Sequence, residues 1–214
     1  MNTIKRVAKN TIALLIAKII SLLLGFFFVV YTARYLKPEG FGILSFALAF
    51  TGIFSIFTDL GISTLTVREI ARDKSLTGKY LGNITAMKII LVIITFGLII
   101  LTINLLDYSE QTINVVYLVA LYVVLGAFSR MFYSIYQAFE RMEYQSIGQI
   151  LNTLLLFLGA LFAISQGFDV IGFAFIYLFS GLIVLGYNLY IFFRVFRYVK
   201  LRTGIDWNFW KYII

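Results

Sequence analysis

Residues 144–193 read YQSIGQILNTLLLFLGALFAISQGFDVIGFAFIYLFSGLIVLGYNLYIFF, and Asp169 is the single charged residue among them. The uncharged runs on either side of it, 144–168 and 170–193, are 25 and 24 residues long. A helix needs about 20 apolar residues to cross the hydrocarbon core of a bilayer. This stretch therefore predicts two membrane-spanning helices joined by a short turn. Barrel strands would be about ten residues long and would alternate apolar with polar side chains, which these runs do not.

The same pattern recurs along the rest of the chain. Three further runs without charge cover 40–58, 89–106 and 111–129, and residues 10–33 are interrupted by Lys18 alone. We therefore expect an all-α fold, a polytopic membrane bundle of six transmembrane helices. Their expected bounds are about 11–35, 41–64, 83–106, 113–137, 146–166 and 170–193.

Composition separates this chain from soluble domains. Hydrophobic residues make up 61% of its 214 residues and charged residues 13%, whereas about 25% charge is usual in a soluble protein. With neither Cys nor His, the chain cannot form a disulfide, a thiolate metal site, or a Ser-His-Asp or Cys-His catalytic group. We therefore expect no enzymatic activity, no cofactor and no metal site. The net charge of +8 indicates cationic loops at an anionic membrane surface rather than a nucleic-acid interface.

The distribution of Lys and Arg predicts how the bundle is oriented. Thirteen basic residues fall on the side of the amino terminus, whereas the loops of the other side carry two, Arg34 and Lys37. Positively charged loops stay in the cytoplasm, so we expect both termini there, in a multi-pass protein of the cell membrane. Residues 67–82 have soluble character and predict a short amphipathic helix and turn on this cytoplasmic face.

Ionisable residues inside the spans are the first candidates for a functional site, because charge in a bilayer is costly. Lys18 shares a partly polar face of the first span, but snorkelling to the interface explains it equally well. Lys88 lies so near the start of the third span that snorkelling is the simpler interpretation. Asp59 either caps the short helix that begins near Ser63 or pairs with a basic residue of another span.

Arg130 lies deep in the fourth predicted span, 113–137. The same helix face carries Gln137, and the fifth span presents Gln145, Gln149 and Asn152 at helical spacing. We expect these two polar faces to meet, either as a structural hydrogen-bond network or as the lining of a shared cavity. Basic residues, amides and tyrosines inside an apolar bundle suit an anionic headgroup such as a phosphate. The candidate binding residues are Lys18, Lys88, Arg130, Gln149 and Asn152.

Two short motifs carry a resemblance to a known family. They are 31–45, YTARYLKPEGFGILS, and 58–72, TDLGISTLTVREIAR. Together with Gln137-Ala138 and Glu140-Arg141 at the end of the fourth span, they resemble the amino-terminal half of polysaccharide biosynthesis flippases. These flippases belong to the multidrug/oligosaccharidyl-lipid/polysaccharide exporter superfamily. The resemblance extends over essentially the whole chain.

The resemblance implies a transporter that moves polyprenyl-linked oligosaccharide across the cytoplasmic membrane by alternating access. Two six-helix lobes would enclose a cationic cavity, with the anionic pyrophosphate headgroup inside it and the polyprenyl tail in lipid. The implied protein partner is a second lobe or a second copy of the chain, and no nucleic acid is involved. Within the motifs, Arg34, Arg68 and Glu69 are read as loop and gate residues. Asp59 is a further coupling or gate candidate.

The chain departs from that family in length, because members normally carry twelve to fourteen spans. We expect one six-span lobe over residues 1–200, followed by a cytoplasmic segment, 201–214, that begins a truncated seventh span, as in a split gene or a fragment. Three alternatives stay open. One is a multidrug/cation antiporter of the same superfamily, for which Asp59 is the available membrane carboxylate. The others are a membrane scaffold that does not transport and a gene remnant.

Overall fold

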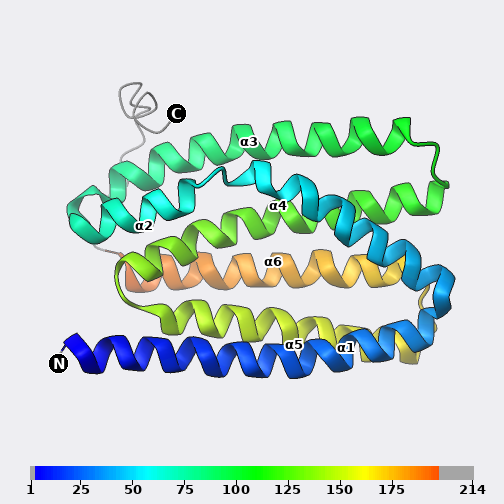
Figure 1. The fold of residues 1–214 in the computed structure, drawn as a ribbon, viewed down its shortest axis with the longest axis horizontal. Helices are drawn as coiled ribbons and strands as arrows, with labels where there is room; N and C mark the ends of the chain where they lie inside the picture. The colour runs from blue at the N-terminus through cyan, green and yellow to red at the C-terminus, as the bar shows by residue number, and fades with distance from the viewer. Residues whose placement is uncertain (1–2, 198–214) are drawn as a thin grey trace.

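The computed structural model describes residues 3–197, which form a bundle of long antiparallel helices (Figure 1). The elements are α1 (Thr3–Phe54), η1 (Ser55–Thr58), α2 (Ile62–Arg72), η2 (Lys74–Leu76), α3 (Thr77–Leu105), α4 (Glu110–Ala138), α5 (Met142–Gln166) and α6 (Val170–Val195). No strand occurs within the described residues. The all-α fold predicted from the sequence is therefore confirmed. The truncated span expected at 201–214 lies outside the described residues.

Helix α1 contains two spans. Its two arms are separated at Lys37, whose backbone is not helical (φ 59°, ψ 176°), and Pro38 follows directly. Proline has no N–H to donate and is pre-set for the first turn of a helix, so it suits the start of the second arm. The chain reverses here, at the end of the bundle opposite the amino terminus (Figure 1). Within residues 3–197, five helices are long and apolar enough to cross a membrane, and dividing α1 at Lys37 gives six spans, the number predicted.

The second span ends earlier than predicted. Helix α1 stops at Phe54, a turn of 3-10 helix follows, and the left-handed backbone of Leu60 and Gly61 (φ 44° and 83°) separates that turn from α2. The span expected over about 41–64 therefore ends as a long helix at Phe54, inside the uncharged run 40–58, and the break itself follows at Asp59, where that run stops. Gly61 is the local signal, since glycine adopts a left-handed backbone without steric cost.

The amphipathic segment on the same side forms α2. This helix begins at Ile62, next to Ser63, where a short helix capped by Asp59 was expected to start, and so extends the segment expected at 67–82 toward the amino terminus. Helix α3 begins at Thr77, inside the segment that was expected to be a turn.

Polar caps and a glycine determine where the later spans begin and end. The Ser109 hydroxyl accepts a hydrogen bond from the N–H of Thr112 at the start of α4, and the Asp169 carboxylate accepts one from Gly172 at the start of α6. Helix α5 ends at Gly167, whose left-handed backbone (φ 73°) is a common helix stop. Asp169 thus marks the turn between the two helices that residues 144–193 predicted.

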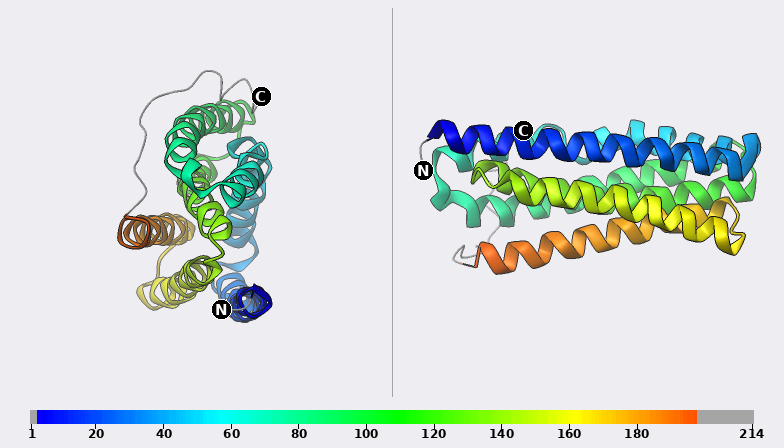
Figure 2. Two further views of the ribbon diagram at one scale, coloured as in Figure 1. Left: turned by 90° about the vertical axis from the view of Figure 1, so that its left-hand side faces the viewer. Right: turned by 90° about the horizontal axis from the view of Figure 1, so that it is seen from below.

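Two apolar clusters hold the bundle together, one toward each end. The first is built around Leu44, Val119 and Phe173. The second includes Tyr136, whose buried hydroxyl donates to the backbone carbonyl of Asn188 at 3.0 Å and so joins α4 to α6. Seen along the bundle, α5 and α6 lie on one side, α2 and α3 on the other, and α4 runs between them (Figure 2). Helix α4 contacts every other long helix and is the central element.

Candidate functional site

Two adjoining cavities lie along α4. The first has a volume of about 590 Å³ and lies beside the break that follows η1; the second has a volume of about 310 Å³ and extends toward α1 and α6. Arg130, Tyr133 and Gln149 line both, so the two cavities adjoin at these residues. We call the first part the outer chamber and the second part the inner chamber. Each falls in the range of about 300–1,000 Å³ that is typical of ligand sites.

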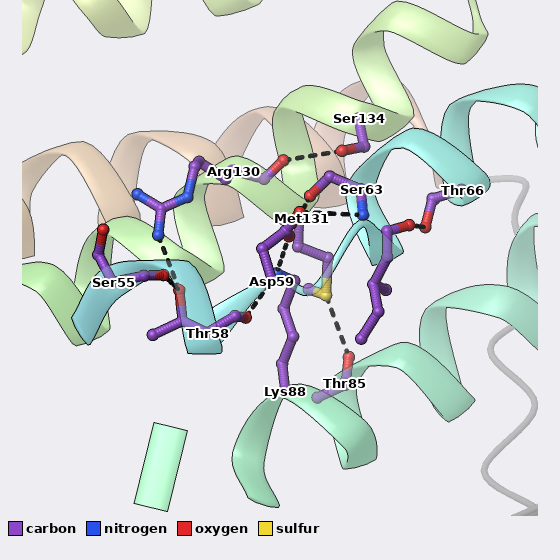
Figure 3. Close-up of polar contacts among 11 residues, drawn as sticks. Ser55, Thr58, Asp59, Ser63, Thr66, Thr85, Lys88, Arg130, Met131 and Ser134 are labelled. Atoms are coloured by element: carbon purple, nitrogen blue, oxygen red, sulfur yellow. Dashed lines mark hydrogen bonds and ion pairs between the residues drawn. The ribbon is translucent and has the colours of Figure 1, made fainter. Parts of the chain in front are cut away.

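Arg130 lies at the junction of the two chambers. Its side chain projects from α4 and is exposed to the cavity. The guanidinium donates one hydrogen bond to the Thr58 hydroxyl at 3.0 Å (Figure 3). Within residues 3–197 this is its one hydrogen bond, so most of its five N–H donors stay available to a molecule in the cavity.

The inner chamber is basic. Lys18 of α1 is exposed and lines it together with Arg130, and none of the described residues in its wall is acidic. The predicted residues Gln149 and Asn152 line the same chamber from α5. Asn152 donates a hydrogen bond to the Tyr122 hydroxyl at 3.1 Å. Four of the five predicted binding residues therefore come together here.

Lys88 is the exception, and the snorkelling interpretation of it is wrong. Its side chain is fully buried, and its ammonium lies 2.7 Å from the Asp59 carboxylate and 3.3 Å from the Thr58 carbonyl (Figure 3). The ammonium donates hydrogen bonds to a carbonyl and a carboxylate at the break after η1. A lysine whose ammonium reached the membrane interface could not make these contacts inside the bundle. Lys88 therefore does not line either chamber. It contacts the cavity wall through its ion pair with Asp59.

Asp59 combines both of its predicted roles. It accepts hydrogen bonds from the Ser63 N–H at 3.4 Å and from the Ser63 hydroxyl, which caps the start of α2. It also pairs with Lys88, and it remains 26% exposed toward the outer chamber. Its charge is thus compensated by a buried cation. Among the described residues, no group of three acidic side chains could hold a metal ion.

The polar faces of α4 and α5 meet, as the sequence predicts. The Gln137 side chain donates to the Gln145 side chain at 2.9 Å. Tyr133 lies against α5 because Gly148 leaves room for it, since a Cβ at that glycine would lie 2.6 Å from the tyrosine hydroxyl oxygen. Tyr122 was not among the predicted residues. The recurrence of polar or small residues at 122, 126, 129 and 133, a 4-3-4 helical spacing, could have identified it.

Of the predicted gate or coupling residues, Asp59 lines the outer chamber, whereas Arg34, Arg68 and Glu69 line neither chamber. Arg34 is exposed near the reversal in α1. On α2, Arg68 lies 3.5 Å and Arg72 lies 3.9 Å from the Glu69 carboxylate, and both arginines are largely exposed. Exposed ion pairs of this kind contribute little to stability. A gating or coupling role for Arg34, Arg68, Glu69 and Asp59 stays a prediction.

An apolar groove lies on the other side of α4. It has a volume of about 510 Å³ and is lined from α3, α4 and α6, with Phe128 and Phe132 contributed by α4. Thr85 also lines it, and its hydroxyl donates to the Leu81 carbonyl at 2.7 Å. Helix α4 therefore separates a polar cavity from an apolar groove.

Comparison with known proteins identifies a family. A family profile described as "Polysaccharide biosynthesis protein" matches residues 7–211. No curated protein matches the sequence significantly.

Solved structures share the fold at low sequence identity. One is a crystal structure of a MATE protein in complex with MaD3S, with 18% identity and a TM-score of 0.74, covering 97% of this chain and 50% of that one. Another is an outward-facing multidrug resistance MATE family transporter of the MOP superfamily, with 19% identity, a TM-score of 0.67, and coverage of 95% and 47%. A third is a MOP superfamily transporter from Pyrococcus furiosus, with 15% identity, a TM-score of 0.65, and coverage of 95% and 47%.

The chain thus spans about half the length of the solved structures that it matches. The expected fold, one lobe of a two-lobe membrane bundle, is confirmed.

Proposed function

Because the chain belongs to the polysaccharide biosynthesis protein family, we propose that it forms one lobe of a transporter that flips polyprenyl-linked oligosaccharide across the cytoplasmic membrane. The observation that carries the proposal is the inner chamber, where Lys18 and Arg130 face a common space without an acidic residue. Two cations inside a membrane bundle attract an anionic group. The guanidinium fork suits phosphate oxygens, and the ammonium acts as a point charge.

In this proposal the diphosphate occupies the inner chamber. Arg130 supplies the N–H donors that no described residue uses, and Lys18 supplies a second positive charge. Gln149 and Asn152 add amide donors from α5, while the polyprenyl tail remains in lipid. A second six-span lobe, or a second copy of this chain, would face the cavity and complete it.

Orientation is part of the proposal. The start of α1 and the end of α6 lie at the same end of the bundle (Figure 1). The positively charged segments lie on that side, so we place it in the cytoplasm.

A multidrug or cation antiporter is the competing function, and the fold is compatible with it. The cavity lining favours an anion instead. Among the described residues that line either chamber, Asp59 is the one acidic residue, and it pairs with Lys88 at 2.7 Å. A cationic drug would meet Lys18 and Arg130 without a free carboxylate to bind it.

Binding to the 214-residue chain in lipid nanodiscs tests the proposal. We expect undecaprenyl diphosphate to bind and the cation tetraphenylphosphonium not to bind. Removing a hydrogen bond to a charged group costs about 1.5–3 kcal/mol, so Arg130→Gln should weaken diphosphate binding roughly 10- to 100-fold.

The matched control is Arg141→Gln. Arg141 is an exposed arginine that pairs with Glu143 at 3.8 Å and does not line the cavity. This variant should bind diphosphate like the unaltered chain. Equal binding by the Arg130→Gln variant, or binding of tetraphenylphosphonium in place of diphosphate, would refute the proposed function.

A further inference from the structure

The outer chamber differs in chemistry from the inner chamber. Apart from Arg130 at the junction and Asp59, the described residues in its wall carry no charge. Its uncharged polar residues include Ser55, Ser63, Thr64, Gln137, Gln145 and Gln149. At about 590 Å³ it is also the larger of the two.

The one carboxylate in this wall is already compensated. Lys88 lies 2.7 Å from Asp59 on the side away from the chamber, and Ser63 donates to the carboxylate from α2. A molecule in the outer chamber therefore meets a balanced ion pair and not a free negative charge.

The amides in the wall offer both donors and acceptors. The hydrogen bond from Gln137 to Gln145 uses one N–H of the first and the carbonyl oxygen of the second. Within the described part of the chain, Gln137 keeps one N–H and its carbonyl oxygen, and Gln145 keeps two N–H groups. A phosphate could use the donors alone and a cation the acceptors alone. A hydroxyl group both donates and accepts, so an uncharged, hydroxyl-rich group makes the fullest use of this wall.

The two chambers are arranged in line along α4. From Arg130 to Gln137 the helix rises about 10 Å, at about 1.5 Å per residue. A group attached to a diphosphate at Arg130 that extended along α4 toward Gln137 would therefore enter the outer chamber.

We infer that the outer chamber is a subsite for the uncharged sugar linked directly to the diphosphate. The inference rests on the proposed function, because it requires the diphosphate to lie between Lys18 and Arg130. It goes further by assigning the sugar to the amides of α4 and α5 and by specifying that this sugar is neutral. An acidic sugar would find no cation in the outer chamber beyond Arg130, which the diphosphate occupies.

The test compares three probes with the same chain in nanodiscs. They are undecaprenyl diphosphate, undecaprenyl diphosphate carrying N-acetylglucosamine, and undecaprenyl diphosphate carrying glucuronic acid. We expect the N-acetylglucosamine carrier to bind about tenfold more tightly than the bare carrier, as one to two added hydrogen bonds would give. The glucuronic acid carrier should bind no more tightly than the bare one.

The variants are Gln137→Met and Gln145→Met, singly and together. Methionine keeps the length of the side chain and removes the amide. Each should reduce the advantage of the N-acetylglucosamine carrier several-fold, and the double variant should abolish it. Binding of the bare carrier should not change, which also shows that the variants are folded.

The outcomes distinguish the two proposals. The sugar subsite is wrong if the bare carrier binds as tightly as the N-acetylglucosamine carrier, or if the N-acetylglucosamine carrier still binds more tightly to the double variant. In either case the proposed function stands. If the glucuronic acid carrier binds best, the assignment of a neutral sugar is wrong. If no carrier binds, the proposed function itself fails.

Discussion

The buried ion pair behind the cavity should respond very differently to the loss of its two members. In Asp59→Asn the Lys88 ammonium stays fully buried and loses its counter-charge, while the acceptors left to it, the Thr58 carbonyl at 3.3 Å and the new amide oxygen, are neutral. Breaking a buried pair from one side costs about 3–5 kcal/mol, because an uncompensated charge remains. Asp59 is partly exposed, so we expect about 3 kcal/mol, the lower end of that range.

The opposite variant should cost less. In Lys88→Met the methylene packing is largely kept, and the remaining carboxylate still accepts from Ser63 and reaches the open chamber. We expect about 1–2 kcal/mol, the cost of a lost hydrogen bond to a charged group that water can partly replace. The double variant leaves no buried charge, and we expect it to cost about 1 kcal/mol rather than the additive sum of about 4–5 kcal/mol.

Equilibrium unfolding in mixed micelles, followed by far-UV circular dichroism, measures these free energies. The two single variants and the double variant form a thermodynamic cycle, and Arg141→Gln serves as an exposed control. A coupling energy near zero would show that the Asp59–Lys88 contact does not hold the break between η1 and α2. Equal losses of stability in the two single variants would refute the argument that the different exposure of Asp59 and Lys88 determines how much each substitution destabilises the protein.

Three further substitutions probe individual contacts by thermal unfolding. Gly148→Val should lower stability by about 1–3 kcal/mol, because the new side chain would overlap the Tyr133 hydroxyl. The control Gly186→Ala should not lower stability, because there is open space around Gly186. Equal effects of the two variants would contradict the tight approach of α4 to α5. Tyr136→Phe should cost about 0.5–1.5 kcal/mol through the lost hydrogen bond to α6, and no loss would show that bond to be unimportant. Lys37→Gly should raise stability by about 1 kcal/mol, since its backbone lies in a region suited to glycine, and a decrease would contradict that strain.

Much of the fold could be predicted from the sequence because the bilayer imposes a simple rule. Uncharged runs of about twenty residues have one structural solution in lipid, and Asp169 alone was enough to locate the turn between two of them. The break after η1 could be predicted in part. The uncharged run 40–58 stops at Asp59, and a short helix was expected to begin near Ser63, but the end of α1 at Phe54 lies within the uncharged run, where neither a charge nor a proline marks it.

The site could be predicted in part. Spacing along single helices identifies faces, so Gln137 and Gln145 were expected to meet and do meet at 2.9 Å. Spacing does not give the relative rotation of different helices. It could not show that Lys88 turns inward to Asp59, or that Lys18 and Arg130 line one chamber. Those relations depend on packing between spans that are distant in the sequence.

The position of α4 between the polar cavity and the apolar groove has a consequence for how this protein can change in evolution. Arg130 faces the cavity while Phe128 and Phe132 face the groove, and successive residues of a helix are separated by about 100° of rotation. A single residue inserted before Arg130 would turn the rest of α4 by that angle and carry polar groups toward the groove and aromatic rings toward the cavity. Relatives should therefore keep the length of α4 together with its polar and aromatic sides, and insertions should be confined to the short connections around residues 106–109 and 167–169.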